Sequence, residues 1–256
     1  MKTSTPTLRL DRLLANMGYG SRKDIQALVK AKRILLDGVP VTDADAHVPV
    51  SPALSARLKV AGAPLDPPPG FALMLHKPLG VTCSHKEVGP LVYGLLPPRW
   101  RARKPAISTI GRLDKETSGL LLMTDDGGLL HRVIAPKSNV SKRYRVTLAR
   151  ALRGDERTIL ASGTLMLDGE DKPLLPVAME IVPDLPKNEP VVFVTLTEGR
   201  YHQVRRMFAA LGNHVAALHR DRVGGLTLPA ELAPGAYQVL GVDAIAQLFH
   251  EPSVSK

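Results

Sequence analysis

A run of three prolines, Pro67–Pro69, is the feature that most constrains how this chain can fold. Each proline fixes its own φ and lacks a backbone N–H, so three in succession hold the chain in an extended polyproline II conformation. A run of this kind acts as a short, semi-rigid spacer. We therefore expect two units, residues 1–66 and 71–250, joined by a proline-rich linker at residues 67–70.

The first unit has the pattern of two short helices followed by a small sheet. Apolar residues recur at helical spacing over residues 10–17, and a Gly-Tyr-Gly segment then ends that helix. Ser21 and Asp24 form the capping-box pattern that starts a second helix. Residues 34–41 hold an Asp-Gly pair between two apolar runs, which predicts a hairpin with a primed turn.

The second unit is predicted to be strand-rich α+β. Residues 143–148 alternate between apolar and polar side chains, and residues 119–124 form a continuous apolar run typical of a buried strand. A helix over residues 203–211 is closed by a glycine. The expected strands are Phe71–Leu75, Gly119–Thr124, Arg143–Leu148 and Val191–Thr197, and the expected helices are Leu129–Ile134, Gln203–Leu211 and Val242–Phe249.

Both units carry an excess of positive charge. The whole chain has 34 Lys and Arg against 24 Asp and Glu, a formal net charge of +10. Residues 1–70 contribute ten basic against six acidic residues, and the remainder is basic as well. This balance favours a polyanionic partner that contacts both units. The alternative is a solvated surface with a general excess of Lys and Arg.

Several classes of function find no support in the sequence. Cys83 is the single cysteine, so we expect no internal disulfide, no cysteine-based zinc site and a reducing, cytoplasmic location. A buried, unreactive thiol is the expected state of Cys83. His202 and His219 lack a companion at metal-ligand spacing, so no metal is expected. There is no dinucleotide fingerprint, no phosphate-binding loop and no apolar run long enough for a membrane span, so neither a cofactor nor a membrane is expected.

The segment with the clearest chemistry is Gly111–Thr124. It places the carboxylate of Asp114 beside Arg112 in a polar turn, directly before the apolar run that predicts a buried strand. A rigid strand would hold the turn accurately, as a reactive group requires. Asp114 is therefore the candidate catalytic residue.

Three further segments could contribute to the same site. Lys77 stands in a Lys-Pro turn followed by glycine, which can approach a ligand closely or can be an ordinary surface turn. Lys142 and Tyr144 lie on an expected strand, where the tyrosine could equally be a core residue. Residues 197–207 predict a strand, a glycine turn and the basic start of a helix.

In this order, the four segments resemble the motifs of RNA pseudouridine synthases over about residues 71–240. The resemblance implies a catalytic domain with a mixed, mainly antiparallel sheet and isomerisation of a flipped-out uridine without a cofactor. It implies that Asp114 acts as nucleophile or base, with Arg205 as its partner and Arg206 as the neighbouring alternative. An arginine close to the carboxylate would favour its charged form. The substrate-binding residues implied are Arg112, Tyr144, Arg205, Lys77 and Lys142.

The first unit resembles the S4-like RNA-binding domain over about residues 7–62. The matching features are the opening R-L-D-x-L-L-A, the G-x-x-S-R run and the late turn at residues 34–38. By this resemblance the RNA-binding face is the second helix and its approach, where a helix start also offers N–H groups to phosphate. The RNA-binding residues implied are Arg12, Ser21, Arg22, Lys23, Lys30, Lys32 and Arg33.

The attached RNA-binding unit and the segments Glu198–Val204, Gly212–Val215 and Leu218–Arg220 are similar to the branch that modifies 16S ribosomal RNA of the small subunit. The partner implied is ribosomal RNA within a partly assembled small subunit, bound by a monomer of this chain. The alternatives are a 23S ribosomal RNA synthase of the same family and a non-catalytic RNA-binding or ribosome-assembly factor. A methyltransferase would need a glycine-rich loop after its first strand, and residues 75–80 do not resemble one.

Overall fold

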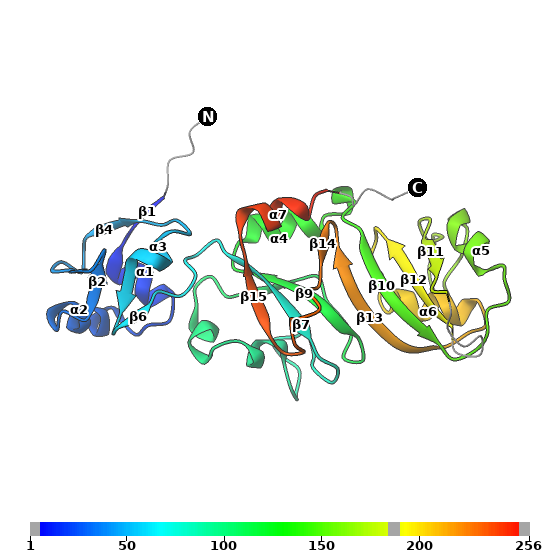
Figure 1. Ribbon diagram of the computed structural model, residues 1–256, viewed down its shortest axis with the longest axis horizontal. Coiled ribbons are helices and arrows are strands. Elements are labelled where there is room, and N and C mark those ends of the chain that lie inside the picture. Colours follow the sequence, from blue (N-terminus) through cyan, green and yellow to red (C-terminus); the bar gives the residue numbers. More distant parts are fainter. Residues whose placement is uncertain (1–5, 184–189, 251–256) are drawn as a thin grey trace.

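A computed structural model describes residues 6–183 and 190–250 of the chain. Figure 1 shows a small first unit beside a larger second one. The first unit contains β1 (Thr7–Arg9), α1 (Leu10–Asn16), α2 (Arg22–Lys30), β2 (Ile34–Leu36), β3 (Val39–Pro40), β4 (His47–Pro49), α3 (Leu54–Arg57), β5 (Leu58–Val60) and β6 (Ala63–Pro64).

The second unit is built on a nine-stranded sheet with short helices around it. Its strands are β7 (Ala72–Lys77), β8 (Ser108–Ile110), β9 (Ser118–Thr124), β10 (Lys142–Leu148), β11 (Ala178–Ile181), β12 (Val191–Leu196), β13 (Val215–Val223), β14 (Leu226–Thr227) and β15 (Tyr237–Leu240). Its helices are η1 (Val92–Leu95), η2 (Pro98–Ala102), α4 (Gly127–Ile134), η3 (Pro136–Ser138), α5 (Glu156–Ser162), α6 (Gln203–Ala210) and α7 (Val242–Gln247).

Local sequence signals determine the first unit as predicted. The Ser21 side chain accepts a hydrogen bond from the Asp24 N–H, and the Asp24 carboxylate accepts one from the Ser21 N–H, so the capping box is confirmed. Asp37 and Gly38 both have positive φ, as a primed hairpin turn requires. The hairpin pairs β2 with β3, and the sheet continues in the order β3-β2-β5-β6. The apolar faces of α1 and α2 pack together over the strands.

Asp66 and the first proline of the linker make contacts at the boundary between the two units. The backbone N–H of Asp66 donates to the Tyr19 hydroxyl of the first unit at 2.9 Å, and its carboxylate accepts hydrogen bonds from Arg99 of the second unit at 2.8 and 3.0 Å. Arg103 donates to the Pro67 carbonyl at 2.9 Å. These contacts support the semi-rigid spacer predicted from the prolines, while the boundaries at residues 66 and 71 stay a prediction.

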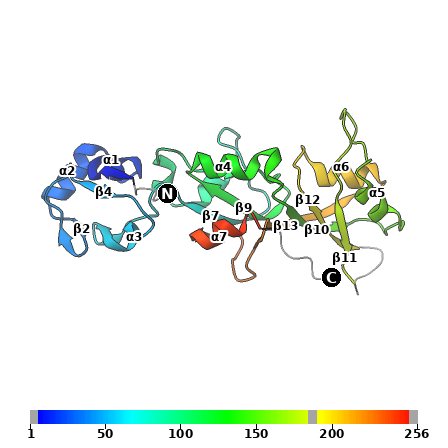
Figure 2. The same cartoon turned by 90° about the horizontal axis from the view of Figure 1, so that it is seen from above.

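The large sheet has the order β11-β12-β10-β13-β9-β7-β15 and is antiparallel except at one junction. There β13 and β9 run parallel and pair only at His219–Ser118 and Arg220–Gly119. Figure 2 shows α4 and α6 on the same side of the sheet, over the β9 half and the β10 half respectively. The parallel junction therefore divides the sheet into two halves, each with its own covering helix.

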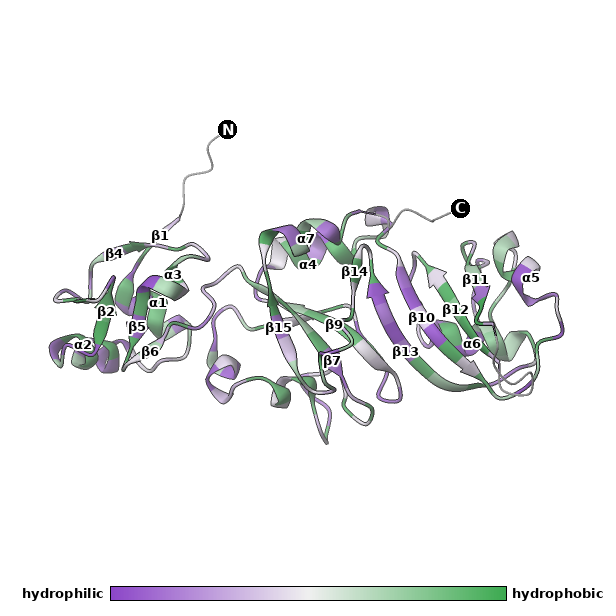
Figure 3. Ribbon diagram, viewed as in Figure 1, coloured by the Kyte–Doolittle hydropathy of each residue, from purple (hydrophilic) through white to green (hydrophobic). Residues whose placement is uncertain are grey.

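The four predicted strands and three predicted helices of this unit are confirmed to within two residues at each end. The prediction missed β13, which is the longest strand described, and also β11, β15 and α5. Figure 3 shows that β13 and β10 carry hydrophilic residues in the middle of the sheet, whereas β7 and β9 are largely apolar. Polar residues on central strands mark the place where the sheet serves a site instead of a core.

Candidate active site

Asp114 lies in the tight turn that leads from β8 into β9, beside the parallel junction. The Thr117 N–H donates to the Asp114 carbonyl at 3.0 Å and closes the turn. Leu113 and Thr117 are buried on either side, while the Asp114 side chain is 34% exposed. The turn therefore has buried anchors and presents a single carboxylate to a cavity, as the sequence predicted.

Lys77 supports this turn from behind. Its side chain is fully buried, and its ammonium group donates to the carbonyls of Pro78 at 2.9 Å, Lys115 at 3.3 Å and Thr117 at 2.8 Å. Burial lowers the pKa of Lys77, and the nearby carboxylates of Glu116 and Asp114 offset part of that effect. The sequence predicted that Lys77 contacts the substrate, but the structure places its ammonium group beneath the cavity wall, where it holds the backbone of the Asp114 turn.

A cavity of about 420 Å³ opens beside Asp114, and both α4 and α6 contribute to its wall. This volume is in the range of small-molecule sites. Four cationic side chains line it together with Asp114 and Glu198: Arg112, Lys142, Arg200 and Arg220. The sequence predicted the first two, and the structure brings both of them into one cavity with Tyr144.

Arg220 is the site residue that sequence reasoning missed. It is 4% exposed, its Nε donates to the Leu120 carbonyl at 2.8 Å, and its Nη1 lies 3.4 Å from the Tyr144 hydroxyl. The sequence analysis used the segment Leu218–Arg220 only as a mark of the branch, and that segment lies in strand β13. Burial, followed by the charge of Arg220, lowers the pKa of Lys142. Two cations held this close favour an anionic ligand such as a phosphate.

The predicted ion pair between Arg205 and Asp114 does not form. Arg205 donates to the carbonyls of Glu116 at 2.7 Å and Val215 at 3.0 Å, and it therefore braces the far side of the Asp114 turn. Among the residues that the structure describes, the basic group in ion-pair range of Asp114 is His202, whose Nε2 lies 3.5 Å from Oδ1.

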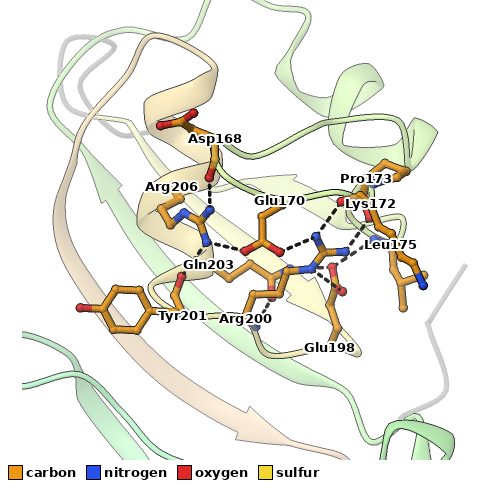
Figure 4. Close-up of polar contacts among 10 residues, drawn as sticks. All are labelled: Asp168, Glu170, Lys172, Pro173, Leu175, Glu198, Arg200, Tyr201, Gln203 and Arg206. Atoms are coloured by element: carbon orange, nitrogen blue, oxygen red, sulfur yellow. Dashed lines mark hydrogen bonds and ion pairs between the residues drawn. The ribbon is translucent and has the colours of Figure 1, made fainter.

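The alternative partner, Arg206, also points away from Asp114. It binds the Glu170 carboxylate at 2.8 Å and the Asp168 carbonyl at 2.6 Å (Figure 4). Both predictions failed for the same reason, because α6 packs on the sheet through Val204 and Met207. The arginines between these two residues point sideways along the helix and not toward the cavity.

The predicted RNA-binding residues of the first unit lie on its surface. Ser21 and the six basic residues are all exposed, and Ser21 also serves as the cap of α2. Arg22 and Lys23 lie in the first turn of α2, where backbone N–H groups add to the cationic surface, whereas Lys30, Lys32 and Arg33 lie at the other end of the helix. The residues concerned are Arg12, Ser21, Arg22, Lys23, Lys30, Lys32 and Arg33.

Three other features concern metal binding, membrane spans and the single cysteine. Within residues 6–183 and 190–250, no three His, Cys, Asp or Glu side chains gather in a way that could hold a metal ion. In the same ranges, no helix is both long enough and apolar enough to cross a bilayer. Burial raises the pKa of the Cys83 thiol, which agrees with its predicted unreactive state.

Comparison with known proteins supplies the context for this geometry. The RNA pseudouridylate synthase family matches residues 72–210, and the S4 domain matches residues 8–51. The chain is 38% identical over 246 residues to "Uncharacterized RNA pseudouridine synthase YtzG" of Bacillus subtilis, covering 96% of this chain and 99% of that protein. It is 38% identical over 247 residues to "Ribosomal small subunit pseudouridine synthase A" of Escherichia coli K12, covering 94% and 100%. A solved structure described as a pseudouridylate synthase superimposes with a TM-score of 0.64 at 34% identity, covering 94% and 99%.

Proposed function

The chain belongs to the RNA pseudouridylate synthase family and is an RNA pseudouridine synthase, and we propose that its substrate is a uridine in 16S ribosomal RNA of the small subunit. Support comes from relatives named for that subunit, which match this chain over nearly its whole length, including the S4 domain. The net charge of +10 suits a polyanionic partner such as ribosomal RNA. A partly assembled subunit is the proposed form of the substrate, bound by a monomer in the cytoplasm.

We assign the chemistry to Asp114. The reaction breaks the bond between C1′ of the ribose and N1 of uracil, turns the base, joins C1′ to C5, releases the proton from C5 and protonates N1. It is a rearrangement without net oxidation, so a carboxylate that acts as nucleophile or base can drive it. The observation that carries the assignment is that Asp114 shares one cavity with Tyr144, Lys142 and Arg220.

The other residues of the cavity receive binding roles. We assign to Tyr144, which lines the cavity, the role of stacking on the uracil after it leaves the RNA stack. We assign to Arg220 and Lys142 the binding of phosphate or sugar oxygens of the same nucleotide. Arg112 is exposed and also lines the cavity, and we assign to it the neighbouring phosphate or the position vacated by the flipped base.

The catalytic assignment is tested by Asp114→Asn, which keeps the shape of the side chain and removes its charge. Isomerisation, followed by tritium release from C5-labelled uridine in an RNA transcript, should fall by more than about 10³-fold, while RNA affinity stays within about twofold. The matched control is Glu116→Gln, which removes an exposed carboxylate from the same turn and should leave turnover intact. If Asp114→Asn kept more than a few per cent of the activity, the assignment would be wrong.

The substrate is tested separately. Pseudouridine is mapped in the ribosomal RNA of cells with and without this protein, and purified protein is given small-subunit RNA, large-subunit RNA and partly assembled subunits. One missing pseudouridine in the small-subunit RNA is the expected result. A missing site in large-subunit RNA would support the 23S alternative, and RNA binding without any isomerisation would support the assembly-factor alternative.

A further inference from the structure

Tyr201 is an unusually exposed aromatic residue on the rim of the cavity. Its side chain is 69% exposed, although a tyrosine usually buries most of its ring. The ring stacks on His202 with centroids 3.9 Å apart and planes 16° from parallel. His202 in turn lies 3.5 Å from Asp114. Carboxylate, imidazole and phenol ring therefore form a continuous row from the cavity to its outer edge.

The turn that carries Tyr201 is held rigidly. The buried side chain of Gln203 accepts a hydrogen bond from the Arg200 N–H at 2.8 Å and donates to the Glu198 carboxylate at 2.9 Å. Arg206 donates to the Tyr201 carbonyl at 3.2 Å. The structure therefore exposes the ring on a fixed support and not on a free loop.

A second loop braces the same turn from outside. Glu170 binds both Arg200 and Arg206, and Arg200 also donates to the carbonyls of Lys172 at 2.8 Å and Pro173 at 2.5 Å (Figure 4). This network fixes the backbone on both sides of the Tyr201 ring. An aromatic group ordered before its ligand arrives adds little entropic cost to binding, which is the advantage of a preorganised contact.

The surroundings of the ring indicate which ligand it takes. Arg112, Lys142 and Arg220 line the same cavity, so the ligand is an anion with an aromatic part, as in a nucleic acid strand. One face of the Tyr201 ring is covered by His202, so a further ring can stack only on the outer face. The target uridine cannot be that ring, because Asp114 and Tyr144 act inside the cavity and Tyr201 lies beyond His202.

We propose that Tyr201 is a stacking platform for a nucleobase that flanks the target uridine in the RNA strand. The proposal rests on the proposed function, since it assumes that the strand enters the cavity at Asp114. Stacking on the platform holds the flanking nucleotide in place while its neighbour is flipped. Loss of one base–aromatic stack is expected to weaken RNA binding by about 5- to 150-fold.

The test compares Tyr201→Ala, Tyr201→Phe and Tyr201→Leu in the full-length protein. The probe is a fragment of small-subunit RNA that contains the uridine converted by the wild-type enzyme, made also with an abasic residue at each flanking position. Tyr201→Ala and Tyr201→Leu should bind the RNA more weakly than the wild-type protein, and Tyr201→Phe should keep the wild-type affinity because the ring remains. Ile181→Ala is the matched control, since it removes an exposed apolar side chain at a different place, on strand β11. Thermal unfolding shows whether each variant is folded.

The abasic probes form a cycle with the variants. At one flanking position, removal of the base should weaken binding of the wild-type protein and should have little further effect on Tyr201→Ala. Normal affinity of Tyr201→Ala, or fully additive losses at both positions, would overturn the platform. If the wild-type protein converts no uridine in any ribosomal RNA, the proposed function fails instead, and the two failures are thereby distinguished.

Discussion

Replacing Lys77 with methionine should damage both the fold and the rate, and should hardly change RNA binding. Methionine has a similar length and apolar body but donates no hydrogen bond. The two short bonds of the ammonium group, to Thr117 and Pro78, are lost, and buried carbonyls without a donor cost about 1–3 kcal/mol each. Relief of the buried charge offsets part of that cost. We expect the free energy of unfolding to fall by about 2–5 kcal/mol.

The same bonds hold the Asp114 turn, so a loosened turn misplaces the carboxylate. Displacement by about 1 Å can reduce a rate by about 100-fold, and we expect kcat to fall by about 10- to 100-fold. RNA affinity should change by less than about threefold, because the buried ammonium group is not on the RNA-facing surface. Urea unfolding, single-turnover rates and RNA binding measure the three quantities. Lys115→Met, in the exposed part of the same turn, is the control.

Unchanged stability and rate in Lys77→Met would refute the supporting role. Normal stability with weakened RNA binding would instead support the prediction from the sequence that Lys77 contacts the substrate. The three measurements therefore separate a group that holds the site from a group that touches the ligand.

Two further predictions concern the parallel junction of the sheet. Gly119→Ala should lower the free energy of unfolding by more than about 3 kcal/mol, because a Cβ at this positive φ would overlap the Arg220 backbone. The control is Gly111→Ala, whose Cβ meets no neighbouring atom and which should cost about 1–2 kcal/mol. A similar melting temperature for both variants would contradict this prediction. Burial, and then the charge of His76, lowers the pKa of His219 below 6.5. As the pH falls, His219 therefore takes up a proton in the unfolded chain at a higher pH than in the folded protein. The free energy of unfolding consequently decreases as the pH falls through about 6.5. His219→Gln should flatten this dependence in urea unfolding at about pH 7.5 and about pH 5.5, and an unchanged slope would count against it.

The parts of the fold that were predictable are those determined by neighbouring residues. The capping box of Ser21 and Asp24 and the primed turn at Asp37 and Gly38 need only a few residues to specify them. The alternation along β10 likewise reveals a strand with one buried face. In the catalytic unit, the order of segments also located the Asp114 turn correctly.

The parts that were not predictable depend on contacts between distant segments. β13 presents Arg220 to the cavity where a strand would normally bury an apolar side chain, and its register shifts twice against β10. Lys77 is buried only because three carbonyls converge on it, and lysine is almost never fully buried otherwise. Arg220 lies in the site because β13 pairs in parallel with β9, and no local sequence pattern predicts this pairing.

The failed pairing of Arg205 with Asp114 clarifies how the site works. A carboxylate held by a bidentate arginine has its lone pairs occupied, and that pair would have to break before the carboxylate could attack carbon or accept a proton. Here the nearby cations donate to main-chain carbonyls instead: Lys77 to Thr117, Arg205 to Glu116 and Arg220 to Leu120. These bonds fix the turn and the strand on which Asp114 depends, and they leave its carboxylate without an arginine partner, with the His202 Nε2 3.5 Å from Oδ1.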